Sequence, residues 1–332
     1  MEVLMTTIIL IIILALIFEF INGFHDTANA IAMSVSTKAL SPRFAVIYAG
    51  VLNFVGALIS QAVAKSIGGK IADPFQIDNG MIIVIAALIA AIFWNLFTWY
   101  FGIPSSSSHT LIGSVAGAVI FSEGLNSINW EGFTDIIKAL IISPFLAFIV
   151  GFIIMKILRV LFQNANPQRA TNGFRRIQVL AAGLAAFSHG GNDGQKTMGI
   201  IVFALVAGGF QSSLDVPFWV QVMCAATIGI GTMIGGMRII KTVAKKIFKV
   251  QPINGFAADV SSFVVMQGAT FLGVPVSTTH VSSSSILGVG SAKRFRGVNW
   301  GVAIRIVSTW VITLPISALI AGLVVVILNL FF

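Results

Sequence analysis

The stretch Asn22-Gly23-Phe24-His25-Asp26-Thr27-Ala28-Asn29-Ala30 places a carboxylate, a histidine and two amides inside an apolar run that begins at Val3. A related stretch, His189-Gly190-Gly191-Asn192-Asp193-Gly194-Gln195-Lys196-Thr197, occurs in the second half of the chain. The two aspartates lie 167 residues apart. We refer to these stretches as the first and second aspartate motifs.

A second polar motif is also repeated. Gly102-Ile103-Pro104-Ser105-Ser106-Ser107-Ser108-His109 is followed 171 residues later by Gly273-Val274-Pro275-Val276-Ser277-Thr278-Thr279-His280. Two unlike motifs that recur in the same order at nearly the same spacing indicate an internal duplication. We therefore predict two repeats, residues 1–162 and 177–332, joined by a polar bridge at 163–176.

The composition predicts an integral membrane protein. Of 332 residues, 57% are hydrophobic and only 9% are charged, against roughly 25% charged in soluble domains. Several apolar runs approach or exceed the ~20 residues with which a helix spans a bilayer. The expected fold class is all-α, a polytopic transmembrane bundle in the cell membrane. Basic cytoplasmic loops explain the net charge of +9, so no nucleic-acid partner is expected.

The charged residues predict the sidedness of the chain. Basic residues gather around the bridge, at 238–249 and at 293–296, whereas the loop 123–135 carries three acidic residues and no basic one. Placing the basic clusters in the cytoplasm puts this loop and both termini outside. Each half then crosses the membrane an odd number of times, which inverts the second repeat relative to the first, as in many secondary transporters.

The lengths of two apolar runs predict interruptions of regular helix. As unbroken helix, 3–36 and 177–209 would each be about 50 Å long, too long for a ~30 Å hydrocarbon core unless tilted or interrupted. We expect breaks at Asn22-Gly23 and at Gly190-Gly191, where freed backbone groups could line a cavity.

The pair 81–101 and 104–122 forms either two crossings or a re-entrant hairpin. The hairpin is favoured because it brings the serines to the depth of Asp26.

The two aspartates are the candidate cation site. A carboxylate at mid-membrane costs a few kcal/mol, so it is expected to be paired, protonated or functional. Carboxylate, amide and free carbonyl oxygens suit Na⁺, which Asp26 and Asp193 would bind with help from Asn22, Asn29 and Asn192. A proton on the carboxylate is an alternative, and a purely structural salt bridge between Asp193 and Lys196 is another.

The hydroxyl-rich motifs are the candidate anion site. Pro104 and Pro275 introduce stretches that resemble helix starts, with hydroxyls able to cap the first turn. Free N–H groups and the positive end of the helix dipole bind anions. Alternatively, the hydroxyls only cap buried helix ends. The expected ligands of a tetrahedral oxyanion are Ser105, Ser106, Ser107, Ser108, Ser277, Thr278, Thr279 and Lys196.

All four histidines fall within the motifs. They are His25, His109, His189 and His280. His109 and His280 are repeat partners and are expected to support the site, whereas titration near neutral pH leaves a proton relay open for His25. Glu19 and Asp259 are further buried-acid candidates without a repeat partner.

At these motifs the sequence resembles the inorganic phosphate transporter (PiT) family of secondary symporters, in its bacterial form. The resemblance is carried by Gly23 to Ala30, Ser188 to Gly199 and Gly273 to His280, and it spans both halves. It implies phosphate uptake coupled to Na⁺ or H⁺, with the aspartates and hydroxyl clusters at the substrate and ion sites and with no cofactor. His25 stands where animal members have asparagine, so H⁺ coupling is an open option.

We therefore expect a symporter that imports phosphate by alternating access. Sulfate or a metal–phosphate complex is an alternative cargo, and an anion channel is an alternative class. An intramembrane hydrolase that uses Ser108 and His109 is disfavoured, because adjacent residues on one helix do not face each other. The protein is thus not expected to be an enzyme, and the sequence leaves a homodimer open.

Overall fold

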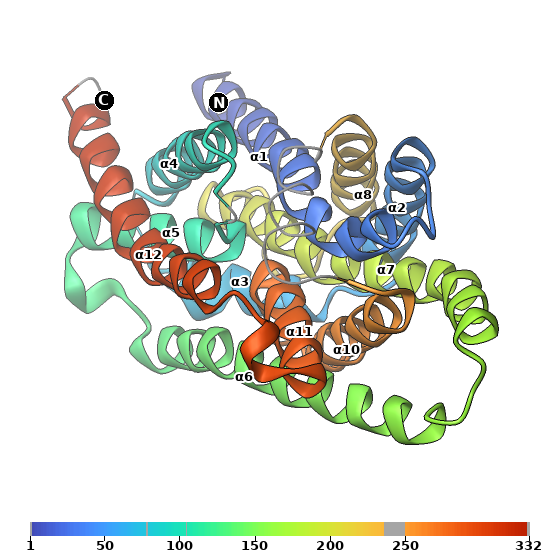
Figure 1. Ribbon diagram of the computed structural model, residues 1–332. Coiled ribbons are helices and arrows are strands. Elements are labelled where there is room, and N and C mark those ends of the chain that lie inside the picture. Colours follow the sequence, from blue (N-terminus) through green and yellow to red (C-terminus); the bar gives the residue numbers. More distant parts are fainter. Residues whose placement is uncertain (1, 78, 104, 236–249, 331–332) are drawn as a thin grey trace.

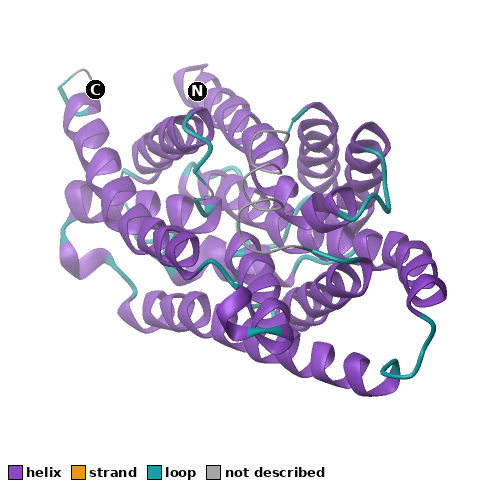
Figure 2. Cartoon of the chain, viewed as in Figure 1, coloured by secondary structure: helices purple, strands orange, loops and turns teal. Residues whose placement is uncertain are grey.

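The structure is a computed structural model that describes residues 2–77, 79–103, 105–235 and 250–330, with the backbone alone at 27–29. The described residues form helices and connecting loops without any strand (Figures 1 and 2). The predicted all-α class is therefore confirmed. The helices are α1 (Glu2–Ser36), α2 (Pro42–Ala57), α3 (Ala62–Lys70), α4 (Gly80–Tyr100), α5 (Ser107–Glu123), α6 (Trp130–Leu161), α7 (Pro167–Ala207), α8 (Phe218–Ile234), α10 (Pro252–Phe271), α11 (Thr278–Lys293) and α12 (Trp300–Leu328), with 3-10 turns η1 (Leu125–Ser127) and η2 (Phe295–Gly297).

The element order repeats along the chain. The series α4, α5, η1, α6 recurs as α10, α11, η2, α12. Trp130 and Trp300 open the last helix of each series, and each indole donates a hydrogen bond to the carbonyl five residues earlier. A proline lies inside each of these helices, at Pro144 and Pro315. These matches extend the duplication well beyond the two polar motifs.

Most of the predicted bridge is helical. Helix α6 ends at Leu161 and α7 begins at Pro167, so only a few residues of 163–176 lie between helices. In Figure 1, α6 runs from the α5–α6 connection at the left to the α6–α7 connection at the right. The division into repeats at 162 and 177 remains a prediction.

The two halves are interlocked. The short helix α5 packs on α12 of the second half, and α11 packs on α6 of the first half. Glycines allow these contacts: a Cβ atom on Gly117 would lie 2.2 Å from a backbone oxygen of α12, and one on Gly288 would lie 2.1 Å from a backbone oxygen of α6. Each half therefore completes the packing of the other.

The predicted breaks at the aspartate motifs are wrong. Helices α1 and α7 continue through both motifs, over 35 and 41 residues. The glycines serve close helix packing instead: a Cβ on Gly23 would lie 2.6 Å from a carbonyl oxygen of α8, and one on Gly190 would lie 2.2 Å from the Asn53 oxygen of α2. A broken helix does occur elsewhere, since α2 and α3 meet at an angle of 71°.

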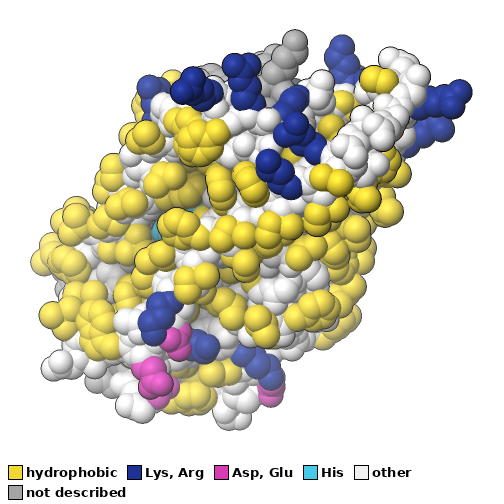
Figure 3. Space-filling model, turned by 60° about the horizontal axis from the view of Figure 1, so that its bottom comes forward, with side chains coloured by type: hydrophobic (Ala, Val, Ile, Leu, Met, Phe, Trp, Pro, Cys, Tyr) yellow, Lys and Arg dark blue, Asp and Glu magenta, His cyan; other side chains and the backbone are white. Residues whose placement is uncertain are grey.

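The molecule has the surface of a membrane protein. In the described part of the chain, α1, α4, α6 and α12 are long and apolar enough to span a bilayer, and the bent α2–α3 pair could form one further span. Figure 3 shows a hydrophobic band, with most of the visible Lys and Arg along one edge, and with Asp and Glu beside a few further basic side chains at the opposite edge. The basic cluster at 238–249 lies outside the described residues.

Helices α5 and α11 are unlike the spanning helices. They contain 17 and 16 residues, and their side chains are almost all buried within the protein. A helix of this length covers only about 25 Å. This pattern fits the predicted re-entrant arrangement, in which each short helix begins deep inside the bundle.

The close approach of α2 and α7 generates a stability prediction. A Cβ on Gly56 would lie 2.0 Å from the Phe187 oxygen, whereas one on Gly173 would meet nothing within 4 Å. We expect Gly56→Ala to destabilise the fold by about 1–3 kcal/mol, the usual cost of overpacking. Gly173→Ala should be neutral or slightly stabilising, because alanine favours helix. Thermal unfolding in detergent measures both, and equal melting temperatures would contradict the close contact.

Candidate functional site

Two helix starts meet at the centre of the molecule. Helix α5 is capped by Ser106 and α11 by Ser277, and each cap hydroxyl accepts a hydrogen bond from the backbone N–H three residues later, at 3.2 Å in both cases. The Ser277 hydroxyl donates to the Ser106 hydroxyl at 2.7 Å. These two serines are 171 residues apart, so repeat partners touch where the halves meet.

Glycines set the position of these helix starts. Gly102 and Gly273 have φ angles of 65° and 67°, and each follows the helix that precedes the hydroxyl motif. Pro275 does introduce a helix start but lies before the first turn, because α11 begins at Thr278 after a short non-helical segment. The Ser277 hydroxyl can cap the helix, and a proline cannot. Pro104 lies outside the described residues.

Each helix start is bonded to an aspartate of its own half. Ser107, the first residue of α5, donates its hydroxyl hydrogen to Asp26 on α1. Thr278, the first residue of α11, donates to Asp193 on α7 at 2.8 Å. Both carboxylates are buried, with exposures of 1% and 0%. The structure therefore brings the predicted cation and anion residues into one site.

A histidine accompanies each aspartate. His25 Nδ1 lies 2.6 Å from the Asp26 carboxylate, and His189 Nε2 lies 3.2 Å from the Asp193 carboxylate. The two histidines do not occupy equivalent positions, since His25 corresponds to Asn192 and His189 corresponds to Asn22 at the offset of 167. Histidine and asparagine have exchanged places between the repeats.

The asparagines differ in their contacts. Asn22 accepts a hydrogen bond from Ser107 at 2.8 Å and so lies beside the first carboxylate. Asn192 instead donates to Thr270 at 3.1 Å and accepts from the Val276 N–H at 3.3 Å, which positions the segment before α11. The side chain of Asn29 lies outside the described residues.

Lys196 lies between the two helix starts. Its ammonium group donates to the Ser108 hydroxyl at 2.6 Å and to the Val276 carbonyl at 2.7 Å, and it also bonds the Asp193 carboxylate. The side chain is buried. The salt bridge considered from the sequence is thus present. The Lys196 side chain also reaches α5 in the other half of the chain. A positive charge therefore stands where an anion could contact both helices.

The remaining predicted residues surround this centre. Ser105 lies 2.8 Å from the Thr98 hydroxyl and 3.5 Å from His25 Nε2, behind the carboxylate. The rings of His109 and His280 lie 4.3 Å apart. Within the described part of the chain, neither of these two rings is paired with a carboxylate. Thr279 is buried in the first turn of α11.

Some contributing residues were missed from the sequence. Asn53 on α2 contacts His189 Nδ1 at 3.2 Å and donates to Thr232 at 2.8 Å, so it orients the histidine. Thr98 similarly lies 3.3 Å from His25 Nε2. Each is a polar residue within an apolar run, which is the signal that could have identified them.

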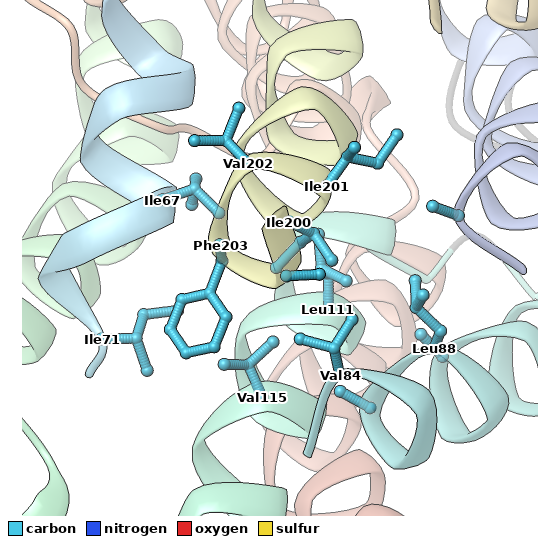
Figure 4. Close-up of a cluster of buried hydrophobic side chains, with 14 of the residues drawn as sticks. Ile67, Ile71, Val84, Leu88, Leu111, Val115, Ile200, Ile201, Val202 and Phe203 are labelled. Carbon is cyan, nitrogen blue, oxygen red and sulfur yellow. The ribbon is translucent and has the colours of Figure 1, made fainter. Parts of the chain in front are cut away.

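Packed side chains fill both sides of the site. Helices α5 and α7 continue from the site toward the acidic end, and there the side chains are apolar, including Leu111, Val115 and Phe203 (Figure 4). Toward the basic end, Asp259 and Ser282 line a narrow pocket. The acidic side is therefore filled by packed hydrocarbon, and on the basic side the two polar groups lie among packed apolar side chains such as Met33 and Ile286.

The buried ion pair generates a second stability prediction. Lys196→Met leaves the Asp193 carboxylate without its cation, which typically costs about 3–5 kcal/mol in a buried pair. The double variant Lys196→Met, Asp193→Asn should recover much of this loss. Thermal unfolding in a sodium-free choline buffer measures the effect.

A surface pair provides the matched control. Lys138→Met breaks the exposed contact between Lys138 and Asp135, and such pairs contribute little to stability. Its melting temperature should equal that of the wild type. A Lys196→Met variant that also melts with the wild type would contradict the importance of the buried pair.

Comparison with known proteins identifies the family of the chain. The phosphate transporter family matches residues 22–321. A protein of Bacillus subtilis (strain 168), described as a probable low-affinity inorganic phosphate transporter, is 54% identical over 100% of both chains. A protein of Rhizobium meliloti (strain 1021) with the same description is 44% identical over 94% of each chain.

A solved structure is also similar. It is named "The sodium-dependent phosphate transporter", superposes with a TM-score of 0.92 at 26% identity, and covers 98% of this chain and 100% of its own. The family match and the identities above extend over nearly the whole chain. This chain therefore belongs to the phosphate transporter family, the PiT family, and is a membrane transporter of phosphate and not an enzyme.

Proposed function

We propose that the protein is a secondary active symporter that imports inorganic phosphate together with Na⁺ by alternating access. One observation carries the proposal. In each half of the chain a hydroxyl-capped helix start is bonded to a buried aspartate, and the two helix starts contact each other through Ser106 and Ser277. The name of the sodium-dependent structural relative supports Na⁺ as the coupling ion.

The helix starts would hold the phosphate. Each supplies free backbone N–H groups, the positive end of a helix dipole and neutral hydroxyl donors. Lys196 adds a full positive charge next to Ser108. Two such starts from opposite sides can donate to several oxygens of a tetrahedral anion at once. Neutral hydroxyls let the anion bind without making its release prohibitively slow.

Lys196 would link phosphate binding to cation binding. In the structure its ammonium group neutralises Asp193. A phosphate that attracts Lys196 would leave Asp193 without a partner, and Na⁺ can then replace the lysine. Without the cation, a free carboxylate so close to the anion would repel it. This relation explains why the two ions would move together.

The unequal approaches support alternating access. The apolar layer of Figure 4 blocks the acidic side of the site, whereas on the basic side Asp259 and Ser282 interrupt the apolar packing. We assign the basic side, together with Asp259, to the cytoplasm and both termini to the outside, by the positive-inside rule. Inverted repeats can exchange their conformations, which would open the blocked side and close the other.

The carboxylates favour phosphate over sulfate. Hydrogen phosphate retains an O–H group that a carboxylate oxygen can accept, and sulfate does not. The hydroxyls of Ser107 and Thr278, next to the proposed anion position, are bonded to Asp26 and Asp193. A freely conducting anion channel is disfavoured because two buried carboxylates would line its narrowest part.

The experiment is phosphate uptake by the purified protein in liposomes. We expect an inward Na⁺ gradient to drive accumulation of radiolabelled phosphate, with little competition from sulfate. Asp26→Asn and Asp193→Asn should each lower this uptake by about tenfold or more, because a carboxylate–cation contact contributes more than 1.4 kcal/mol.

Asp135→Asn is the matched control, since Asp135 lies on the surface and pairs with Lys138. It should transport at the wild-type rate. Wild-type phosphate uptake that does not depend on the Na⁺ gradient would contradict the proposal. Inhibition of this uptake by unlabelled sulfate as strong as that by unlabelled phosphate would also contradict it.

A further inference from the structure

An apolar groove of about 500 Å³ runs along the start of α12 on the outside of the molecule. Leu287 of α11 lines it together with one face of α12 between Trp300 and Ile312. This face extends over about three helical turns, or roughly 18 Å. Ile304 and Val311, which lie in it, are 65% and 70% exposed. Because α12 is long and apolar enough to span the membrane, the groove opens toward the hydrocarbon of the bilayer.

The packing of two helices creates the groove. Helix α12 packs mainly on α5 and α4, whereas α11 packs mainly on α6 and α10. The two helices meet where the rings of His280 and Trp310 stack at 3.8 Å. Beside this contact, α12 presents the small side chains of Ala303 and Ser308 to the groove. The groove is therefore a gap that the described helices do not fill.

Positive charges gather at the end of the groove where α12 begins. Arg294 and Arg296 precede α12, Arg305 lies in its second turn, and all three side chains are exposed. Trp300 lies at the same end, and its indole donates to the Phe295 carbonyl at 3.0 Å. Tryptophan is enriched at the level of the lipid headgroups in membrane proteins. The groove thus begins at headgroup level, beside basic groups, and continues toward the hydrocarbon.

The equivalent face of α6 in the first repeat differs. Helix α6 carries Phe133 where α12 carries Ala303, at the offset of 170 residues that pairs the tryptophans opening both helices. It carries Asp135 where α12 carries Arg305. A ring therefore takes the place of a methyl group, and the charge is reversed. The combination of small groove residues with arginines is a feature of the second repeat.

We propose that the groove binds an anionic phospholipid. One acyl chain lies along α12, and the phosphate group of the lipid accepts hydrogen bonds from Arg294, Arg296 or Arg305. Guanidinium groups match phosphate oxygens in both geometry and charge. A zwitterionic lipid would bring its own cationic group to the same arginines, which disfavours it. This inference does not depend on which cation the transporter couples to phosphate.

A second copy of the chain fits the groove less well. A twofold contact through this face would bring the three arginines of one copy against those of the other. Residues 260–332 contain no Asp or Glu that could neutralise them. Like charges placed together across an interface are unfavourable. The anionic lipid therefore suits the charge as well as the shape of the groove.

The test is photolabelling of the full chain in phosphatidylcholine vesicles that contain a small share of a photoactivatable lipid. The reactive diazirine is carried on the acyl chain, and labelled peptides are mapped by mass spectrometry. We expect photoactivatable phosphatidylglycerol to label the segment 300–312 about tenfold more than photoactivatable phosphatidylcholine does, because each nearby arginine favours the anionic headgroup.

Two variants test the shape and the charge of the groove separately. Ser308→Phe fills the groove from an exposed position, so it should remove most of the labelling of 300–312. The triple variant Arg294→Gln, Arg296→Gln, Arg305→Gln removes the charge and keeps the groove. It should lower labelling by phosphatidylglycerol by about tenfold, to the level of phosphatidylcholine.

Each variant has a matched control. Thr134→Phe adds the same ring to the exposed face of α6, where the Thr134 hydroxyl, like that of Ser308, bonds a carbonyl of its own helix. Arg169→Gln, Arg175→Gln, Arg176→Gln removes three exposed arginines from α7. Both controls should label 300–312 as the wild type does.

Several results would overturn the proposal. Equal labelling of 300–312 by the two lipids would do so, as would labelling that Ser308→Phe leaves unchanged. Loss of labelling in the controls as large as in the test variants would also contradict a site at this groove. Crosslinks between two copies through α12, in place of lipid labelling, would show that a second copy occupies the groove instead.

Discussion

The bond between the first hydroxyl of a short buried helix and a buried aspartate is the interaction on which this structure depends. Ser107 makes it with Asp26, and Thr278 makes it with Asp193. Each bond places a carboxylate at the positive end of a helix, where its burial costs least. It also fixes α5 against α1 and α11 against α7. The helix starts, the carboxylates and the interlocked halves are consequences of one repeated contact.

The duplication supplies symmetry, and a few substitutions remove it. Histidine and asparagine have exchanged positions around the two aspartates. Lys196 corresponds to Asn29, and Glu19 corresponds to Ala186. The backbone of the site is therefore nearly twofold, whereas its charges are not. An asymmetric set of charges allows cations and an anion to occupy distinct positions within a symmetric frame.

Much of the fold and the site could be predicted because the motifs are repeated. The repetition pointed to Asp26, Asp193 and the hydroxyl clusters, and the structure places them together. The role of the glycines could not be predicted in the same way. Gly23 and Gly190 are explained by contacts with α8 and α2, and no local pattern distinguishes a glycine that breaks a helix from one that lets another helix approach. Asn53 was missed for a related reason, since its partner His189 is remote in sequence.

The most direct test of the account is an electron cryomicroscopy structure of the protein with Na⁺ and phosphate. The account predicts a tetrahedral density between the starts of α5 and α11, within hydrogen-bond distance of Ser108 and Thr278. It also predicts that the Lys196 ammonium group has left Asp193. Phosphate bound elsewhere, or phosphate at this position with the bond between Lys196 and Asp193 intact, would contradict it.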